Sequence, residues 1–524
     1  MIEELSIQDK IAELFEVGWN KKKYNKAVIE LRELFDKYQE AITSKDLEQA
    51  TKIYGSAHRK YERHCLAPFT FSKGEKKVLV KLLKTDSVHD EDGGKKIISF
   101  AVMTPQMLLT DYGFFSRNAY WLDHKNQQIE KTDYFYKPFY YELDIYPDDN
   151  MYFERFKGEL SKKDDGWYFA KLIRNDNPEG EGLKKWESLT NIPALLCFSN
   201  SPYTTEEVFF HLLDKVVDDD LEKMLLDLDD TPDASGYDTK VDATLTKISG
   251  IFERPSNAVI YNVGQANCIY LYLHIKGEPF VKRVFFDIGR PFDKVDSKRN
   301  PDLEQNKPAY TSLNNITGCK PSVIIISHWH SDHFLAALTL GRCVYEATSD
   351  CEWIAPLPNE EVLSKYKRLI NFLLIRKKIK FVDYKKFVSS GVIFQKGHFS
   401  LYQGQGTGSD LNESSMLLKI NTSLFAGDCM YRFWPDCLQA ELKTQDSIKQ
   451  MVVPHHGSGL SNDDLILTKN ATGCTRKEAV ISAGTNIWGH PIQKHITELI
   501  NMGFLSPINF NSAGSPQTIV FNLY

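Results

Sequence analysis

The stretch Pro321-Ser-Val-Ile-Ile-Ile-Ser327-His328-Trp329-His330-Ser331-Asp332-His333-Phe334 decides the fold of its part of the chain. Its apolar start, with three consecutive isoleucines, is typical of a buried strand, and the polar run predicts a loop at that strand's carboxyl end. The loop offers four metal ligands within six positions, and burying that many polar groups without a partner would be costly. His328 and His330 can face one point while Asp332 and His333 turn towards a second. The spacing therefore predicts two neighbouring cations rather than a solvated turn.

The segment Ser327-His-Trp-His-Ser-Asp-His333 resembles the HxHxDH signature of the metallo-β-lactamase-fold hydrolases. Further stretches are similar, in the same order, to one branch of that superfamily, the soluble hydrolase domain of the DNA-uptake protein ComEC and its free-standing relatives. They are Asn262-Val-Gly-Gln-Ala-Asn267, Phe285-Phe-Asp287-Ile-Gly289, Asn412-Glu-Ser-Ser415, Ala426-Gly-Asp428, Val452-Val-Pro-His455-His456-Gly-Ser458, and Ser482-Ala-Gly484 with Gly489-His490-Pro491. The resemblance covers residues 256–524 and not the first half.

The resemblance implies an α/β fold for this half, the metallo-β-lactamase αββα sandwich, with its site on loops along one sheet edge. Asp428 matches the family's bridging aspartate, whose two oxygens can hold both cations at once. Nitrogen and oxygen ligands without a thiolate suit two divalent cations, either Zn²⁺ or Mn²⁺. The expected metal ligands are His328, His330, Asp332, His333, Asp428 and His456.

The double histidine leaves an alternative open. His456 stands on the family's ligand position and is the first choice as ligand, while His455 beside it is the second choice, or contacts the substrate or supports the site. His490 resembles a further histidine of the ComEC branch and is expected to reach a metal or the scissile group. Asp332 could orient the attacking water or accept its proton, so Asp332, His455 and His490 are the expected catalytic residues. Ser458 could hydrogen-bond a phosphate oxygen or be a plain turn residue.

The sequence also departs from the family pattern. Asn262 and Asn267 stand where relatives usually carry Asp, which alters the support of the metal site. Many superfamily members place another His upstream of the bridging aspartate. Here His398 reads as a strand position, and Asn412 occupies the region as a possible substrate contact. One cation is therefore expected to have an incomplete set of histidines.

A chain of 524 residues is too long for one ordinary core, so several domains are expected. Helical spacing predicts a helical bundle over 1–70, and short β-rich runs predict a smaller α+β domain over 71–230. Residues 231–255, acidic and rich in turn formers, predict a linker to the hydrolase domain at 256–524. Residues 1–230 carry no motif that states a role, and we expect them to bind a protein partner or a regulatory ligand.

The composition is that of a globular protein, with 42% hydrophobic and 26% charged residues. No apolar run approaches the roughly 20 residues that a membrane span needs, so the ComEC membrane channel has no counterpart here and no membrane association is expected. The nine cysteines lack paired spacing, and the acidic start does not resemble a secretory signal. We therefore expect a cytoplasmic protein with free thiols.

A net charge of −6 argues against a surface that covers long polyanions throughout, so a nucleic-acid surface would have to be local. Such a surface is predicted upstream of Asp428, where nine basic residues fall within 22 positions: Lys365, Lys367, Arg368, Arg376, Lys377, Lys378, Lys380, Lys385 and Lys386. The alternative is a solvated helix face. If the stretch binds phosphates, Lys377 and Lys378 are candidate substrate contacts.

The function that the sequence favours is a metal-dependent phosphodiesterase or nuclease acting on DNA through two cations. The same kind of site could hydrolyse a small cyclic phosphodiester, or polarise the carbonyl of a thioester or lactone. A scaffold with a purely structural metal is the non-enzymatic alternative, although open two-metal loops are poor structural staples.

Overall fold

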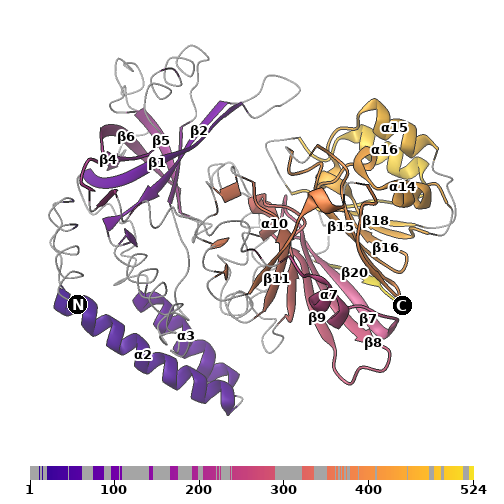
Figure 1. Cartoon of the computed structure of the whole chain (residues 1–524), viewed down its shortest axis with the longest axis horizontal. Helices are drawn as coiled ribbons and strands as arrows, with labels where there is room; N and C mark the ends of the chain where they lie inside the picture. Colours follow the sequence, from indigo (N-terminus) through magenta and orange to yellow (C-terminus); the bar gives the residue numbers. More distant parts are fainter. Residues whose placement is uncertain are drawn as a thin grey trace. The chain divides into compact units, whose positions relative to one another are not determined.

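The computed structural model divides into two compact units (Figure 1). Unit 1 comprises Met1–Thr231 and Leu363–Ile375, and unit 2 comprises Pro232–Val362 and Arg376–Tyr524. The structure describes residues 11, 15, 21–44, 46–61, 75–87, 96–105, 107–108, 141–145, 158, 166–174, 192–198, 205–219, 221–222, 225, 237, 239–289, 321–334, 351–359, 362–363, 366, 369–370, 373–374, 378–387, 389–407, 410–444, 447–470, 477–484, 489–504, 506–510 and 518–524. No described helix is long and apolar enough to cross a membrane.

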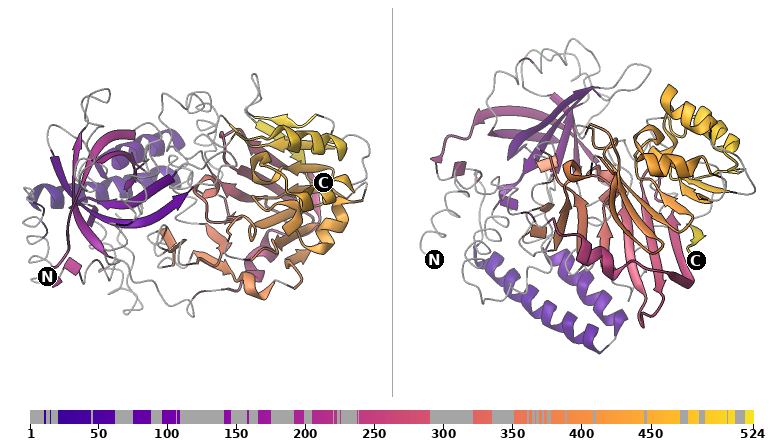
Figure 2. Two further views of the ribbon diagram at one scale, coloured as in Figure 1. Left: turned by 90° about the horizontal axis from the view of Figure 1, so that it is seen from above. Right: turned by 45° about the vertical axis from the view of Figure 1, so that its right-hand side comes forward.

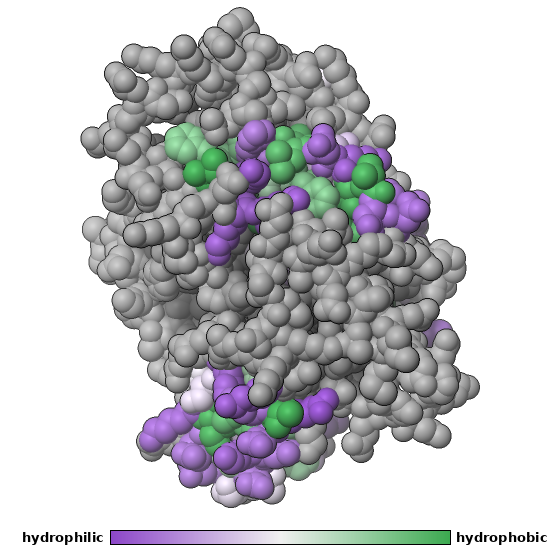
Figure 3. Space-filling view, turned by 90° about the vertical axis from the view of Figure 1, so that its left-hand side faces the viewer, coloured by the Kyte–Doolittle hydropathy of each residue, from purple (hydrophilic) through white to green (hydrophobic). Residues whose placement is uncertain are grey.

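Unit 1 begins with a helical hairpin formed by α2 (Lys21–Thr43) and α3 (Leu47–Tyr61). Leu31, Phe35 and Tyr38 are buried on one face of α2, as the helical spacing of the sequence predicts. The opposite face is polar, and hydrophilic side chains dominate the lower group of coloured residues in Figure 3. Within the predicted helical region, most of the residues that the structure describes lie in these two helices.

The strands of unit 1 close into an antiparallel barrel in the order β1-β2-β3-β5-β6-β4. Phe100 and Phe210 meet inside it, with ring centroids 5.1 Å apart. The sequence predicted a smaller α+β domain here, but most described residues of the region belong to this barrel. Its strands are β1 (Glu75–Ser87), β2 (Lys96–Met103), β3 (Tyr141–Ile145), β4 (Trp167–Arg174), β5 (Ile192–Phe198) and β6 (Thr205–Lys215).

Unit 2 is built from two seven-stranded sheets. The first, in the order β12-β11-β10-β9-β8-β7-β20, contains β7 (Phe252–Tyr261), β8 (Cys268–Ile275), β9 (Lys282–Ile288), β10 (Val323–Ile325), β11 (Glu352–Pro356), β12 (Ile379–Val382) and β20 (Thr518–Asn522). The second runs in numerical order through β13 (Val392–Lys396), β14 (Phe399–Gln403), β15 (Met416–Ile420), β16 (Ser423–Phe425), β17 (Gln450–Val452), β18 (Glu478–Ile481) and β19 (Ile508–Asn509). The buried strand that the isoleucine-rich stretch predicts is β10.

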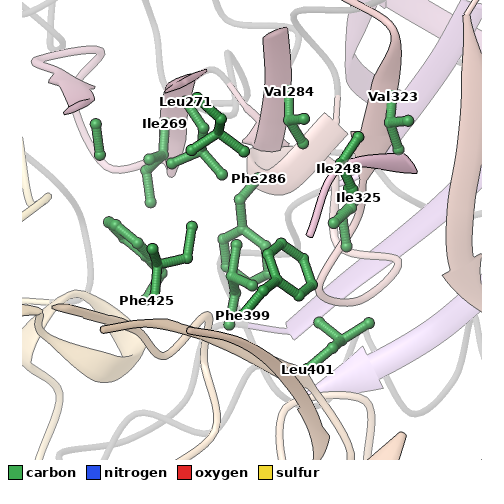
Figure 4. Close-up of a cluster of buried hydrophobic side chains, with 14 of the residues drawn as sticks. Ile248, Ile269, Leu271, Val284, Phe286, Val323, Ile325, Phe399, Leu401 and Phe425 are labelled. Carbon is green, nitrogen blue, oxygen red and sulfur yellow. The ribbon is translucent and has the colours of Figure 1, made fainter. Parts of the chain in front are cut away.

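The two sheets bury one common core between them (Figure 4). Phe286 of β9 and Phe425 of β16 meet across it with ring centroids 6.2 Å apart, and Leu271 and Leu401 belong to the same buried cluster. Alternate residues of each strand point inwards, as in any sheet with one face against a core. Burial of this apolar surface is what holds the sheets face to face.

Helices cover the other face of the second sheet. They are α14 (Asp436–Leu442), α15 (Asn462–Lys469) and α16 (Gln493–Asn501), seen as the orange-to-yellow helices in Figure 2. Leu438, Leu465 and Leu499 pack with outward residues of the second sheet, including Leu424 and Met451, in a separate buried cluster. The unit is thus a mixed α/β structure, in agreement with the predicted class.

The start of unit 2 differs from the predicted linker at 231–255. Within that range, α7 (Asp242–Lys247) forms and β7 begins. Val241, Leu245 and Phe252 are buried in the core between the sheets. This part of the predicted linker therefore belongs to the unit itself, and the boundary between the units lies at 231.

The parallel direction of the strands brings the loops with the candidate metal ligands to the carboxyl ends of the sheets. β9, β10, β11 and β12 are mutually parallel in the first sheet, and β16, β17, β18 and β19 are mutually parallel in the second. Parallel strands bring their carboxyl ends to one sheet edge, where functional loops commonly lie. The histidine-rich loop follows β10, Asp428 follows β16, and the double histidine follows β17.

Candidate metal centre

Trp329 lies between His328 and His330 and anchors the loop that follows β10. The Trp329 side chain is fully buried, its Nε1 donates to the main-chain oxygen of Pro356 at 2.8 Å, and its ring packs edge-on against Phe334. With the intervening residue fixed in the core, His328 and His330 stay together, their ring centroids 4.6 Å apart. A single turn of helix, α10 (Ser331–Phe334), then carries Asp332 and His333.

Asp287 fixes the orientation of His333. It is the last polar residue of β9, has left-handed backbone (φ 55°), and is fully buried. Its Oδ2 lies 2.7 Å from His333 Nδ1 and accepts from Ser327 Oγ at 2.8 Å, while its Oδ1 accepts from the Ser327 amide at 2.7 Å. An imidazole that donates through Nδ1 presents the Nε2 lone pair, which is the form that binds a cation.

The second sheet supplies Asp428 and the double histidine. Asp428 is buried and follows Gly427, whose positive φ of 52° lets the chain turn against Ser327 and Ser415. His455 and His456 both have left-handed backbone, with φ of 48° and 53°. Such a conformation costs a non-glycine residue of the order of 1 kcal/mol or more and typically persists at functional sites.

Four histidines surround the carboxylate of Asp428. His333 Nε2 lies 3.1 Å and His456 Nε2 lies 3.6 Å from Asp428 Oδ1. His328 Nε2 lies 3.7 Å and His455 Nε2 lies 3.8 Å from Asp428 Oδ2. The two carboxylate oxygens of one aspartate thus face two different pairs of imidazoles.

Among the described residues, the side chains that could hold a metal ion form two groups, and Asp428 belongs to both. One group contains Asp332, His333, Asp428 and His456, and the other contains His328, His330 and Asp428. In the first, Asp332 Oδ2 lies 3.3 Å from His456 Nε2. All six predicted metal ligands are therefore brought together at one place.

Four buried nitrogen and oxygen atoms in these groups that could bind a metal ion have no hydrogen-bond partner. They are His328 Nε2, His333 Nε2, His456 Nε2 and Asp428 Oδ1. Buried polar atoms are rarely left unpaired. The other ring nitrogen of these histidines already has a contact, as His456 Nδ1 has with the Ser482 main-chain oxygen at 2.9 Å. The donor set fits a cation that would satisfy these atoms.

Burial and neighbouring charges act in opposite directions on the pKa values of His333 and Asp428. Burial alone would lower the pKa of His333, but the carboxylates of Asp428, Asp287 and Asp332 raise it well above its ordinary value. Burial likewise opposes ionisation of Asp428, yet His333, His456 and His455 hold its pKa well below the usual range. A bound cation would replace the protons that these groups otherwise share.

The predicted catalytic residues lie around this centre. Asp332 keeps 21% of its side-chain surface exposed, and His455 keeps 29%. His490 packs its ring edge-on to His455, with centroids 5.7 Å apart, and its Nδ1 lies 3.5 Å from Gln265 Nε2. The structure therefore gathers Asp332, His455 and His490, although it places His490 against His455 rather than within either metal-binding group.

The candidate substrate contacts fare differently. Ser458 Oγ donates to the sulfur of Met430, so its hydroxyl is directed into the protein, in keeping with the turn reading. Asn412 lies in the turn that leads to Ser415, and its buried Oδ1 has no partner. Lys378 directly precedes β12, at the amino ends of the parallel strands and thus at the sheet edge opposite the histidine loop. Lys377 lies outside the described residues.

The structure also places His398 and Cys429, two other residues of types that can bind a metal ion. His398 occupies the exposed turn between β13 and β14 and belongs to neither metal-binding group, so it does not supply the missing histidine. The Cys429 thiol is fully buried in the core beneath the second sheet, and burial raises its pKa well above the ordinary value. Cys429 belongs to neither metal-binding group and packs in the core as a small apolar residue.

Sequence reasoning missed the residues that orient the ligands. Asp287 and Ser415 were noticed only as parts of family-like motifs, although Ser415 Oγ lies 3.4 Å from His328 Nδ1. Ser482, which contacts His456, was also missed, and it donates a hydrogen bond to Asn267, a residue that the sequence had already linked to the support of the site. A carboxylate at the end of a buried strand needs a partner, but the sequence does not indicate which residue supplies it.

Comparison with known proteins adds no assignment. No protein-family model matches the sequence, and a search of curated proteins finds no significant match.

Proposed function

We propose that unit 2 is a metal-dependent hydrolase of the metallo-β-lactamase fold, similar to the ComEC branch, and that it hydrolyses phosphodiesters with DNA as its substrate. One observation carries the proposal: two groups of potential metal ligands share the buried carboxylate of Asp428. A carboxylate shared in this way is the arrangement by which enzymes hold two cations about 3.5–4 Å apart. The facing sheets with helices outside the second one support the proposed fold.

The residues fit divalent cations in chemistry as well as in number. One cation would be held by His328, His330 and Asp428, and the other by Asp332, His333, His456 and the same Asp428. These donors are nitrogen and oxygen atoms, which Zn²⁺ and Mn²⁺ both accept. When bound, two such ions supply positive charge for a phosphate oxygen and lower the pKa of a water molecule.

Asp332 is placed to manage the proton of the attacking water. Its side chain is partly exposed at the centre, and its carboxylate faces His456. Burial would raise the pKa of Asp332, but His333 and His456 lower it below the ordinary value. The group is therefore ionised at neutral pH, where it can orient a water molecule and accept its proton.

His490 is placed to contact the phosphate. Burial, together with His455 and His456, lowers the pKa of His490 to about 3. The ring is thus neutral at neutral pH and acts as a hydrogen-bond donor rather than as a source of positive charge. In the proposed mechanism it steadies a phosphate oxygen beside His455.

The test is hydrolysis by protein loaded with Zn²⁺ or Mn²⁺. Linear, circular and single-stranded DNA and a bis-aryl phosphodiester should all be cleaved, and DNA binding should weaken steeply with salt. Asp428→Ala and Asp332→Ala should each remain folded and lose activity by about 10³-fold or more, equivalent to about 4 kcal/mol in barrier. The control is His398→Ala, which changes an exposed histidine of the same unit.

Activity of either aspartate variant within about threefold of the wild type would contradict the two-metal assignment. Intact DNA beside rapid turnover of small cyclic phosphodiesters would overturn the choice of substrate. Turnover of thioesters or lactones alone would move the protein to acyl hydrolysis at the same site.

A further inference from the structure

We propose that both residues of the double histidine are metal ligands, each for a different cation, so that His455 takes the place of the histidine missing upstream of Asp428. This inference rests on the proposed two-cation function. The chemical class of ligand is a divalent transition-metal ion such as Zn²⁺, bound through the imidazole of His455 on the Oδ2 side of Asp428.

The first observation is the division of imidazoles around Asp428. His455 Nε2 lies 3.8 Å from Oδ2, almost the same distance as His328 Nε2 at 3.7 Å. The neighbouring His456 faces Oδ1 instead, at 3.6 Å. Two adjacent residues therefore direct their ring nitrogens to opposite oxygens of one carboxylate.

The second observation is the composition of the two donor groups. The group on the Oδ1 side contains two histidines and Asp332 beside Asp428, whereas the other contains only His328 and His330 beside Asp428. His398 cannot complete the smaller group because it lies in an exposed turn. His455 belongs to neither group, yet its Nε2 lies 3.8 Å from Oδ2, on the side of the smaller group that contains His328.

The third observation is how firmly the backbone of His455 is held. Its amide donates to the main-chain oxygen of Gly427 at 3.1 Å, directly beside Asp428, and its own oxygen accepts from the Ser458 amide at 2.9 Å. These bonds maintain the left-handed conformation of φ 48° that aims the ring at the centre. Unusual backbone retained in this way is typical of residues with a specific function.

A histidine that only touched substrate would need the same backbone, so the experiment must detect the metal itself. Metal-free protein is titrated with Zn²⁺ by calorimetry, and the wild type should bind two equivalents. His455→Gly removes the imidazole where glycine adopts the backbone without strain. It should retain one tight equivalent while the affinity for the second falls at least about 100-fold, beyond the effect of most outer-sphere changes. His398→Ala is the matched control and should bind both ions normally.

A second variant gives a direct spectroscopic readout. His455→Cys loaded with Co²⁺ should show the charge-transfer absorption of a thiolate bound to cobalt, since a thiolate is itself a ligand for such ions. The wild type, in which the described Cys429 thiol is packed in the core, should lack that band.

The outcomes separate this inference from the proposed function. Two undiminished equivalents in His455→Gly, or no thiolate band in a folded His455→Cys protein that binds Co²⁺, would overturn the role of His455 and leave the two-cation site standing. Fewer than two equivalents in the wild type would overturn both proposals.

Discussion

At the scale of single residues, the site depends on carboxylates that orient imidazoles. Asp287 accepts a hydrogen bond from the Ser327 amide, and its carboxylate contacts His333 Nδ1. Asp287 itself lies outside both metal-binding groups. All six residues that the sequence predicted as metal ligands belong to the two groups that could hold a metal ion, because they stand next to one another or end apolar strands. Sequence reasoning could not find the contact between Asp287 and His333, since the partners are 46 residues apart and come together only through the parallel pairing of β9 with β10.

Asp287→Asn tests that orienting role. Asparagine tolerates the left-handed backbone at this position, so the change removes the charge and keeps the shape. We expect metal affinity to fall by about 10–100-fold, as is usual when the partner of a ligating histidine is altered. Calorimetric titration with Zn²⁺ measures the effect. Asp463→Asn, at an exposed position of α15, is the control, and equal affinity in both variants would contradict the role of Asp287.

Metal binding should also be linked to pH. In the metal-free protein, burial opposes the charged form of His333 and His456. The nearby carboxylates, Asp428 first, nevertheless raise the pKa of His333 well above its ordinary value and also raise the pKa of His456, which favours the protonated imidazoles. Their contribution to metal-free stability is fully present below the unfolded pKa of about 6.5 and is lost as pH rises through the raised folded values. Metal must displace these protons, so its apparent affinity should increase with pH over the same window.

The measurement is calorimetric titration with Zn²⁺ in buffers that differ in ionisation enthalpy. Proton release on binding, and a metal-free melting temperature that falls above neutral pH, are expected. Binding without proton release at neutral pH would show that the imidazoles are already neutral.

At the scale of elements, the position of α10 depends on close contact with the end of β9. The Asn267 amide donates to the Asp332 main-chain oxygen at 3.1 Å, and the Gly289 amide donates to the Asn267 oxygen at 2.7 Å. A Cβ at Gly289 would overlap the Asp332 oxygen. The glycine of the strand-end motif is thus required by packing and not by a turn.

Gly289→Ala should therefore displace Asp332. We expect the free energy of unfolding to fall by about 1–3 kcal/mol, as in other overpacked sites, together with a loss of metal affinity. Urea unfolding and Zn²⁺ titration measure the two effects. Gly158→Ala is the control, because a Cβ there meets nothing within 4 Å. Unchanged metal binding in Gly289→Ala would show that α10 has room to move.

At the same scale, sequence patterns were sufficient to predict some elements and not others. The short apolar run before the histidine-rich loop predicted β10 because that strand is buried on both faces. The start of unit 2 was not predicted, since Val241, Leu245 and Phe252 are spaced among polar and acidic residues that resemble a linker. The barrel of unit 1 depends on strand pairing, which periodicity does not specify.

At the scale of the whole molecule, the chain passes between the units more than once. The segment Leu363–Ile375 groups with unit 1, although it lies between β11 and β12 of unit 2. No sequence pattern predicted this, because the stretch was interpreted as a basic surface or a solvated helix face, whereas Leu369, Ile370 and Leu373 are buried. A cut at the single predicted boundary would therefore not separate the units cleanly.

Limited proteolysis tests this organisation. Cleavage is expected between Asp218 and Val241, where acidic and turn-forming residues dominate the sequence. The two fragments should remain together in size-exclusion chromatography, since the larger one still carries Leu363–Ile375. Fragments that separate without denaturant would contradict the assignment of that segment to unit 1, and an uncleavable chain would contradict the boundary.

The central claim is that two cations share Asp428, and anomalous diffraction from crystals grown with Zn²⁺ tests it most directly. The account predicts two anomalous peaks about 3.5–4 Å apart, one on each side of the Asp428 carboxylate, with His456 at one and His455 at the other. A single peak, or two peaks that do not share Asp428, would contradict it.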